Sequence, residues 1–185
     1  MADFALEKSA PFDGCDLPQS LGAARLAAVA MGGIIAVMPL KGQSMAVAGA
    51  MKSAFGVTLP KVGEIARASG VELLWFAQGQ WLVINADLQK LTAMQNLAAI
   101  SDQSDGWAML HLDGADAKAV LARLCPLDFD AVRVGCVART EFAHIPAMII
   151  PREDGYWIGL PRSFATTAYE NIIDTMKSVA AQALL

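Results

Sequence analysis

The chain has 185 residues with a formal net charge of −4, and 55% of its residues are hydrophobic while only 17% are charged. This length fits one domain or two small, closely packed lobes, and the composition excludes a disordered chain and, without clustered cations, a non-specific nucleic-acid binder. An ordinary soluble domain has about 45–50% apolar and about 25% charged residues, so we expect the apolar excess to be buried in a large core or against partner proteins.

The N-terminal segment lacks a clear hydrophobic period. We interpret residues 1–28 as an N-terminal arm that becomes ordered against a partner, with one short helix around Gln19 to Ala28. Asp3 and Glu7 stand where a signal peptide needs basic residues, so no signal peptide is expected. The longest uncharged stretch, Leu26 to Leu40, is too short and too interrupted by glycine and proline to span a membrane. We therefore expect a cytoplasmic protein without membrane contact.

The next part of the chain predicts the order strand, helix, hairpin, helix. The predicted elements are a buried strand at 34–40, a helix at 45–55, hairpin strands at 71–76 and 81–84, and a helix at 88–99. Ser44 and Asp87 each precede a helical pattern, where a side-chain oxygen can accept a hydrogen bond from an unpaired amide. Gly56 is placed to end the first helix. The residues between that helix and the hairpin are interpreted as a polar connector.

The second half predicts the same order. Its elements are a strand at 107–112, a helix at 117–124, strands at 136–141, 147–150 and 156–160, and a helix at 164–181. Asp116 and Ser163 are its expected capping residues.

The two halves also match in their turn residues. Residues 40–44 match 112–116 at a shift of 72, and residues 79–84 match 155–160 at a shift of 76. Agreement at turns and caps indicates an internal repeat, with a chance match as the alternative. The fold class is therefore predicted to be α+β, with two strand-helix-hairpin-helix lobes that share or face their sheets and carry helices outside. We expect a single domain over 29–185, made of repeats at about 33–100 and 106–181.

Residues that could bind a metal or a nucleotide are few. Cys15, Cys125 and Cys136 are odd in number and widely spaced, and only His111 and His144 supply imidazoles. This excludes a disulfide framework and a recognisable metal-ligand pattern. No dinucleotide fingerprint, P-loop or zinc-protease motif occurs. We therefore assign no catalytic, cofactor-binding or metal residue.

The nearest approach to a catalytic motif is Gly42-Gln43-Ser44-Met45-Ala46, between a strand and a helix. A hydrolase would use Ser44 as nucleophile, His111 or His144 as base, and Asp128 as acid. The second glycine of a nucleophile elbow is replaced by Ala46, and the repeat matches Ser44 with a capping aspartate, so capping is the preferred role. We expect His144 to be a structural residue near a hairpin, and His111 to face away from its strand neighbours, partly exposed or at an interface.

Five segments, in the same order, resemble the gamma subunits of heterotetrameric sarcosine oxidase. They are 73–83 (LLWFAQGQWLV), 101–105 (SDQSD), 119–128 (AVLARLCPLD), 135–140 (GCVART) and 161–165 (PRSFA). The resemblance extends over roughly residues 33–177. It implies a fold similar to the folate-binding domain of aminomethyltransferases, a pseudo-symmetric α+β fold that agrees with the repeat.

The resemblance also implies a function. It implies a non-catalytic gamma subunit that packs against the alpha, beta and delta subunits of an enzyme oxidising sarcosine to glycine. That enzyme releases hydrogen peroxide and passes the one-carbon unit to tetrahydrofolate or frees it as formaldehyde. The FAD, FMN, NAD, zinc and tetrahydrofolate of the complex are expected in partner subunits, and none in this chain. The KGCYxGQE signature of related folate-binding proteins is not matched at residues 133–139.

Four alternatives remain from the sequence alone. They are a folate-binding or aminomethyltransferase-like protein that acts alone, a serine hydrolase that uses Ser44, a structural protein with another partner, and self-association of the isolated chain to bury its apolar surface.

Overall fold

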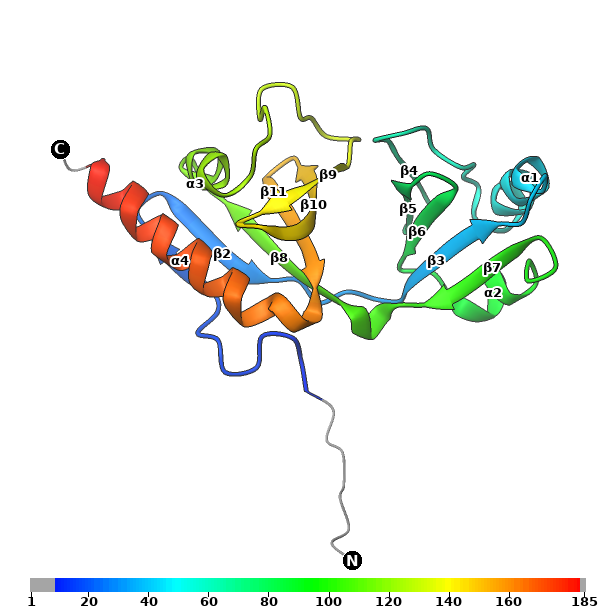
Figure 1. Cartoon of the computed structure of the whole chain (residues 1–185), viewed down its shortest axis with the longest axis horizontal. Helices are drawn as coiled ribbons and strands as arrows, with labels where there is room; N and C mark the ends of the chain where they lie inside the picture. Colours follow the sequence, from blue (N-terminus) through cyan, green and yellow to red (C-terminus); the bar gives the residue numbers. More distant parts are fainter. Residues whose placement is uncertain (1–8, 184–185) are drawn as a thin grey trace, which may run out of the picture.

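The first lobe is built on a five-stranded antiparallel sheet. The computed structural model describes residues 9–183, and in this range the sheet has the order β4-β5-β6-β3-β7 (Figure 1). Its strands are β3 (Ile34–Pro39), β4 (Ile65–Ala68), β5 (Val71–Ala77), β6 (Gln80–Ile84) and β7 (Ala98–Asp102). Two helices cover its outer face, α1 (Ser44–Phe55) and α2 (Leu88–Thr92).

The second lobe is built on a six-stranded antiparallel sheet with the order β1-β2-β8-β11-β10-β9. Its strands are β1 (Gln19–Leu21), β2 (Ala24–Ala28), β8 (Trp107–Asp113), β9 (Ala138–Phe142), β10 (Ile145–Arg152) and β11 (Gly155–Pro161). Its helices are α3 (Ala117–Leu124) and α4 (Ala165–Gln182), and short 3₁₀ turns lie at Ser104–Gly106 and Arg162–Phe164. The α+β class predicted from the sequence is confirmed.

The chain begins in the second lobe, builds the whole first lobe and then returns to the second. Along the chain β2 precedes β3, yet β2 pairs with β8 in the other sheet; β7 precedes β8, yet β7 pairs with β3. The segments 29–33 and 103–106 therefore both cross between the lobes (Figure 1). The strand order β4-β5-β6-β3-β7 corresponds to β9-β10-β11-β8-β2. The first sheet is built from the continuous segment 34–102, whereas the second sheet combines β1 and β2 with strands from residues 107–161.

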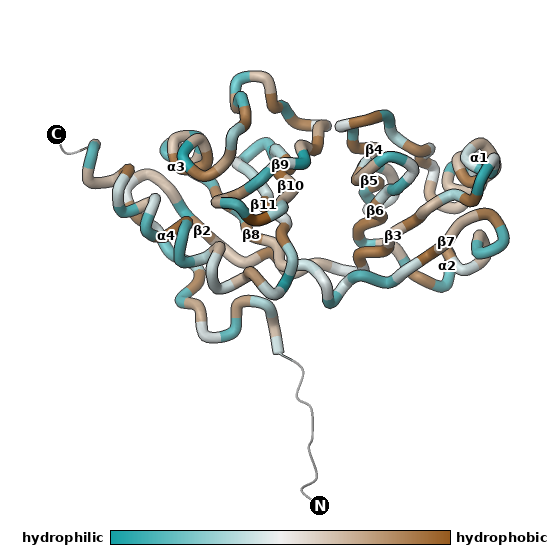
Figure 2. The backbone as a smooth tube through the Cα atoms, viewed as in Figure 1, coloured by the Kyte–Doolittle hydropathy of each residue, from teal (hydrophilic) through white to brown (hydrophobic). Residues whose placement is uncertain are grey.

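Alternating strand residues divide the core into three layers. On β8, Leu110 and Leu112 face α3 and α4, while Met109 faces the other lobe. On β3, Ile35 faces α1, while Ile34 faces the second lobe. The sheets thus pack against each other through an apolar inner layer, and the helices lie outside, as the sequence predicts. Figure 2 shows these hydrophobic stretches along the strands of both sheets.

A short bridge joins the edge strands of the two sheets. The amide of Ile65 donates to the carbonyl of Gly135, and the amide of Val137 donates to the carbonyl of Gly63, both at 2.9 Å. These residues lie at the starts of β4 and β9. The lobes are therefore connected by main-chain hydrogen bonds as well as by side-chain packing.

Three predicted elements differ from the structure. The helix expected around Gln19 to Ala28 is wrong: these residues form the β1–β2 hairpin, because Gly22 makes the turn and Leu26 is buried against β8. The helix expected to extend to Ala99 ends at Thr92, because β7 pairs with the free edge of β3. The polar connector contains β4. Residues 1–8 of the predicted arm lie outside the described residues.

One of the four predicted capping side chains acts as expected. Asp87 accepts a hydrogen bond from the amide of Gln89 at 2.9 Å. Ser44 is instead the first residue of α1 and makes no capping bond, and Ser163 lies in the 3₁₀ turn before α4. Asp116 stands at the N-cap of α3, but its carboxylate accepts from the amide of Ala23 at 3.0 Å. The β1–β2 turn therefore uses the oxygen predicted to cap the helix.

Candidate functional site

The four residues of the hypothetical hydrolase lie in separate places. Ser44 is exposed at the start of α1 in the first lobe, and His111 lies on β8 in the second. His144 is exposed in the tight turn between β9 and β10, with a φ of 67°, and Asp128 lies in the loop after α3. Within residues 9–183, no hydrogen bond joins Ser44 to either histidine. The structure does not assemble a Ser-His-Asp arrangement.

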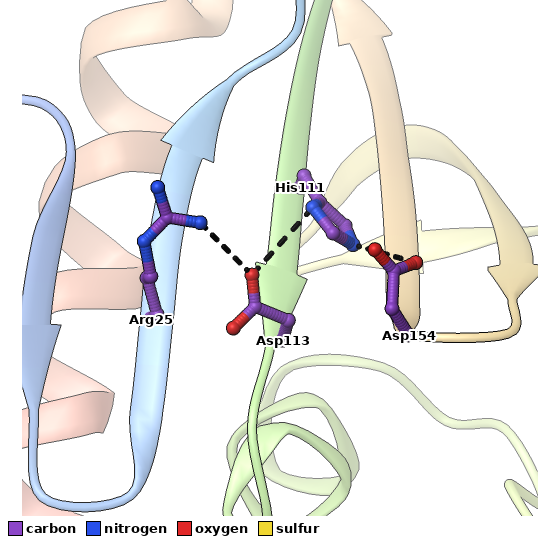
Figure 3. Close-up of polar contacts among 4 residues, drawn as sticks. All are labelled: Arg25, His111, Asp113 and Asp154. Carbon is purple, nitrogen blue, oxygen red and sulfur yellow. Dashed lines mark hydrogen bonds and ion pairs between the residues drawn. The ribbon is translucent and has the colours of Figure 1, made fainter.

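His111 is instead the centre of a charged cluster on the inner side of β8 (Figure 3). Its Nδ1 lies 3.6 Å from Oδ2 of Asp113, and its Nε2 lies 3.4 Å from Oδ1 of Asp154. The guanidinium of Arg25, on β2, lies 3.3 Å from the same oxygen of Asp113. The cluster links β2, β8 and the β10–β11 turn.

The position of this histidine follows from strand geometry. Leu110 and Leu112 point into the helix-covered core, so the side chain of His111 points the opposite way, as the sequence predicts. It is 15% exposed, and its cross-strand neighbours are Ala27 and Trp157. A carboxylate lies near each ring nitrogen, and Nε2 forms no hydrogen bond within residues 9–183.

A second polar group crosses the lobe boundary beside this cluster. Arg152, at the end of β10, binds both carboxylate oxygens of Glu72 on β5, at 2.7 and 3.0 Å. Its guanidinium lies 3.6 Å from the centroid of the Trp157 ring, and Arg67 lies 3.1 Å from the same glutamate. The side chains of Arg152 and Glu72 are 12% and 17% exposed, so the pair is largely shielded from water. It fixes the relative position of β5 and β10.

An aromatic contact holds the lobes together elsewhere on the boundary. The guanidinium of Arg139, on β9, lies 3.9 Å above the ring of Phe76 on β5, and it donates to the Phe76 carbonyl at 3.3 Å. The Phe76 ring meets Trp107 edge to face at 5.5 Å. Burial lowers the pKa of Arg139 from its usual value, yet an arginine stays charged at physiological pH.

Two cavities border these groups. One of about 480 Å³ is lined by His111, Arg152, Glu72, Trp157 and the end of β2. A larger one, of about 720 Å³, lies between residues 9–17, the two crossing segments and Arg162. The larger cavity has the volume of a small-molecule site, and its wall is mostly apolar.

Metal and thiol chemistry find little support in the described residues. No group of three or more His, Cys, Asp or Glu side chains in residues 9–183 is arranged to hold a metal ion.

Burial raises the pKa of Cys125 to about 12, and burial together with Glu170 raises that of Cys15. Hydrogen bonds from Ser104 lower the pKa of Asp102, whose role is to fix the crossing segment. In the same residues no helix is long and apolar enough to cross a membrane.

The sequence reasoning missed the charged residues between the lobes. Glu72 and Arg152 lie at strand ends that were treated only as hairpins. The sequence did contain a sign of the contact between the lobes. Residues 61–67 (KVGEIAR) match residues 133–139 (RVGCVAR) at the same shift of 72 that relates residues 40–44 to 112–116. This match includes both segments of the bridge and the pair Arg67 and Arg139.

Comparison with known proteins then identifies the family. No family model matches the chain. A curated relative, the sarcosine oxidase subunit gamma of Corynebacterium sp. (strain U-96), is 30% identical over 143 residues, which cover 71% of this chain and 70% of the relative. The chain belongs to the family of sarcosine oxidase gamma subunits. The resemblance read from five short segments is therefore confirmed.

A solved structure also matches the fold. The solved heterotetrameric sarcosine oxidase from Corynebacterium sp. U-96, in complex with pyrrole 2-carboxylate, contains a chain that aligns with a TM-score of 0.79. The alignment covers 94% of this chain and 96% of that chain, at 24% sequence identity. This chain therefore shares its α+β fold with a chain of that solved complex.

Proposed function

We propose that this gamma subunit is a non-catalytic component of a heterotetrameric sarcosine oxidase, where it packs against the alpha, beta and delta subunits and maintains their relative geometry. The observation that carries the proposal is the match over most of the chain to a curated gamma subunit. Large apolar side chains exposed on the isolated chain support it. They are Leu40, Met45, Val62, Val134 and Phe164. Such side chains are typical of surfaces that a partner covers.

The reaction of the proposed complex takes place on the partner subunits, in the cytoplasm. It oxidises sarcosine to glycine with release of hydrogen peroxide, and it yields formaldehyde or methylenetetrahydrofolate. FAD, FMN, NAD, zinc and tetrahydrofolate are assigned to the partners. Within residues 9–183, the histidine that is best placed for chemistry has both ring nitrogens facing carboxylates, which supports a structural role.

The proposal includes a doubled domain similar to the folate-binding domain of aminomethyltransferases. The corresponding strand orders of the two sheets support this relation. The predicted division into an arm at 1–28 and one domain at 29–185 stays a prediction, and the pairing of β2 with β8 brings residues Ala24–Ala28 into the second sheet.

Co-expression tests the assembly role. The alpha, beta and delta subunits from the same genome are produced with and without this chain, and the assembled complex is measured by native mass spectrometry and by sarcosine-dependent peroxide release. We expect this chain to co-purify in equal proportion, and its omission to reduce both the assembled complex and the turnover. Normal assembly and turnover without it would contradict the proposal.

The cavity of about 720 Å³ favours one alternative, a folate-binding protein that acts alone. Its volume fits a small ligand, and Trp107 and Arg162 supply an aromatic face and a cation. Calorimetry with tetrahydrofolate on the isolated chain distinguishes the two functions. Saturable binding by the isolated chain would favour the alternative, whereas the assembly role predicts no heat of binding.

A further inference from the structure

The two lobes present a matched pair of turns at the bridge that joins them. In one turn the amide of Glu64 donates to the carbonyl of Lys61, and in the other the amide of Cys136 donates to the carbonyl of Arg133, each at 3.0 Å. The third residue of each turn is a glycine in the left-handed region, with φ of 74° and 93°. The two turns are therefore alike in sequence and in conformation.

The bridge holds these turns side by side. Each turn leads directly into the residues that exchange the two hydrogen bonds between Gly63–Ile65 and Gly135–Val137. In Figure 1 the segments that lead into β4 and β9 approach each other at the top of the molecule, above both sheets. The pair of turns thus forms one continuous feature contributed equally by both lobes, which is named the paired turns below.

An apolar side chain projects from the second position of each turn. Val62 is 74% exposed and Val134 is 40% exposed, and neither belongs to the three core clusters. Turn positions of this kind usually carry proline or a polar residue. A β-branched apolar residue at both equivalent positions makes no contribution to the core of this chain, which indicates a surface that another molecule covers.

The residues before the valines are cations. Lys61 and Arg133 are exposed, and within residues 9–183 neither forms an ion pair. The carboxylate within the turns is Glu64, which accepts from the main-chain amide of Lys61 at 3.2 Å, and Glu153 and Asp154 border the same hollow as Arg133 and Val134. Within residues 61–64 and 133–136 two cations stand against one carboxylate, although the chain as a whole has a net charge of −4.

We propose that the paired turns are a docking surface for a partner subunit, which receives the two valines in an apolar recess bordered by carboxylates. This inference rests on the proposed assembly function and assigns a surface to it. The charge favours a partner with acidic residues over a second copy of this chain. Two copies related by a twofold axis would bring Lys61 and Arg133 against the same cations, and like charges in contact oppose association.

The test uses full-length variants and an immobilised complex of the alpha, beta and delta subunits from the same genome. One variant carries Val62→Asp and Val134→Asp, and another carries Lys61→Glu and Arg133→Glu. The matched control carries Ala93→Asp and Ala99→Asp, two exposed positions at the end of α2 and on β7, away from the paired turns and outside the exposed apolar set named above. Thermal melting followed by circular dichroism verifies that each variant is folded.

We expect the two paired-turn variants to bind the subunit complex about tenfold or more weakly than the wild type, as substitutions at the centre of an interface do. The control should bind within about twofold of the wild type, and wild-type binding should weaken with added salt. Unchanged binding of folded paired-turn variants would overturn the inference and leave the assembly function intact. An equal loss in the control would also overturn it.

Two further outcomes separate this inference from the function on which it rests. If the wild-type chain does not bind the subunit complex at all, the assembly function itself fails. If light scattering shows a wild-type dimer that Val62→Asp and Val134→Asp dissociate, the paired turns bind a second copy, and the acidic partner is wrong.

Discussion

The environment of Cys125 determines how its thiol reacts. The side chain is buried in the core of the second lobe, and burial raises its pKa to about 12 from an ordinary value of 9.0. Because the folded-state pKa is the higher one, the fold favours the neutral thiol. This contribution to stability is complete below pH 9 and is lost as the pH rises toward 12.

The prediction is slow modification of Cys125 at pH 8. A thiol reagent followed by peptide mass spectrometry should label Cys136, which is only half-buried, well before Cys125. In denaturant all three cysteines should react at similar rates, which serves as the control. Equal rates for Cys125 and Cys136 in the folded protein would contradict the burial argument.

The charge pair between the lobes gives a second prediction at this scale. Arg152→Met removes both hydrogen bonds to Glu72 and the contact with the Trp157 ring, and it leaves a largely buried carboxylate with only Arg67. We expect the free energy of unfolding to fall by about 2 kcal/mol, less than for a fully buried pair because water still reaches both groups.

Urea denaturation measures this loss, and an exposed ion pair supplies the control. Lys177 and Asp174 lie 3.0 Å apart on α4 with side chains that are 61% and 76% exposed. Lys177→Met should change the free energy of unfolding by less than about 0.5 kcal/mol. A loss for Arg152→Met as small as that of the control would show that the pair between the lobes contributes little.

At the scale of elements, two turns with the same sequence pattern differ in their surroundings. Gly42 and Gly114 are related by the shift of 72, and both have positive φ, of 80° and 97°. A Cβ on Gly42 would meet nothing within 4 Å, whereas a Cβ on Gly114 would lie 2.0 Å from the carbonyl oxygen of Ala23. The β1–β2 hairpin covers one turn and leaves the other free.

Alanine at the two positions therefore should have unequal effects. Gly42→Ala only forces a residue with a Cβ into the left-handed conformation, so we expect the free energy of unfolding to fall by about 1–2 kcal/mol. Gly114→Ala also displaces the main chain of the β1–β2 turn. We expect its free energy of unfolding to fall by at least about 2 kcal/mol more than that of Gly42→Ala. Chemical denaturation of the two variants checks the difference. Equal losses would mean that the hairpin does not pack against the β8 turn in solution.

The elements that the sequence predicted well are those with local signals. The β5–β6 and β10–β11 hairpins have glycines at their turns, and Asp87 caps its helix as expected. The β1–β2 hairpin was predicted as a helix because alanine-rich sequence favours a helix in isolation. Its burial pattern alternates between Ala24, Leu26 and their neighbours, since it lies on a sheet whose other strands come from residues 107–161.

The candidate site shows the same division between local and distant information. The orientation of His111 followed from its two leucine neighbours, whereas its carboxylate partner Asp154 lies across a hairpin and was not predicted. Glu72 and Arg152 are 80 residues apart in sequence, and only the facing of the sheets brings them together. The repeat at residues 61–67 and 133–139 was visible in the sequence, but its meaning depends on the bridge.

At the scale of the whole molecule, the two crossing segments and the apolar layer between the sheets couple the lobes. The first sheet needs β7, whose chain continues into β8, and the second sheet needs β2, whose chain continues into β3. If one sheet unfolded, it would free a strand whose chain continues directly into a strand of the other sheet. A local window of sequence does not reveal the pairing of β2 with β8, because the whole first lobe lies between these two strands along the chain.

The coupling predicts that the two lobes unfold together. Hydrogen exchange followed by mass spectrometry at increasing urea concentration should show protection lost at one common midpoint for peptides from β3, β5 and β6 and for those from β8, β10 and β11. Exposed ends and loops, such as the turn at His144, should exchange earlier and provide the internal reference. If the first-lobe strands lost protection at a lower urea concentration while those of the second lobe stayed protected, the lobes would be separate folding units. The two crossing segments would then connect the lobes without making their unfolding cooperative.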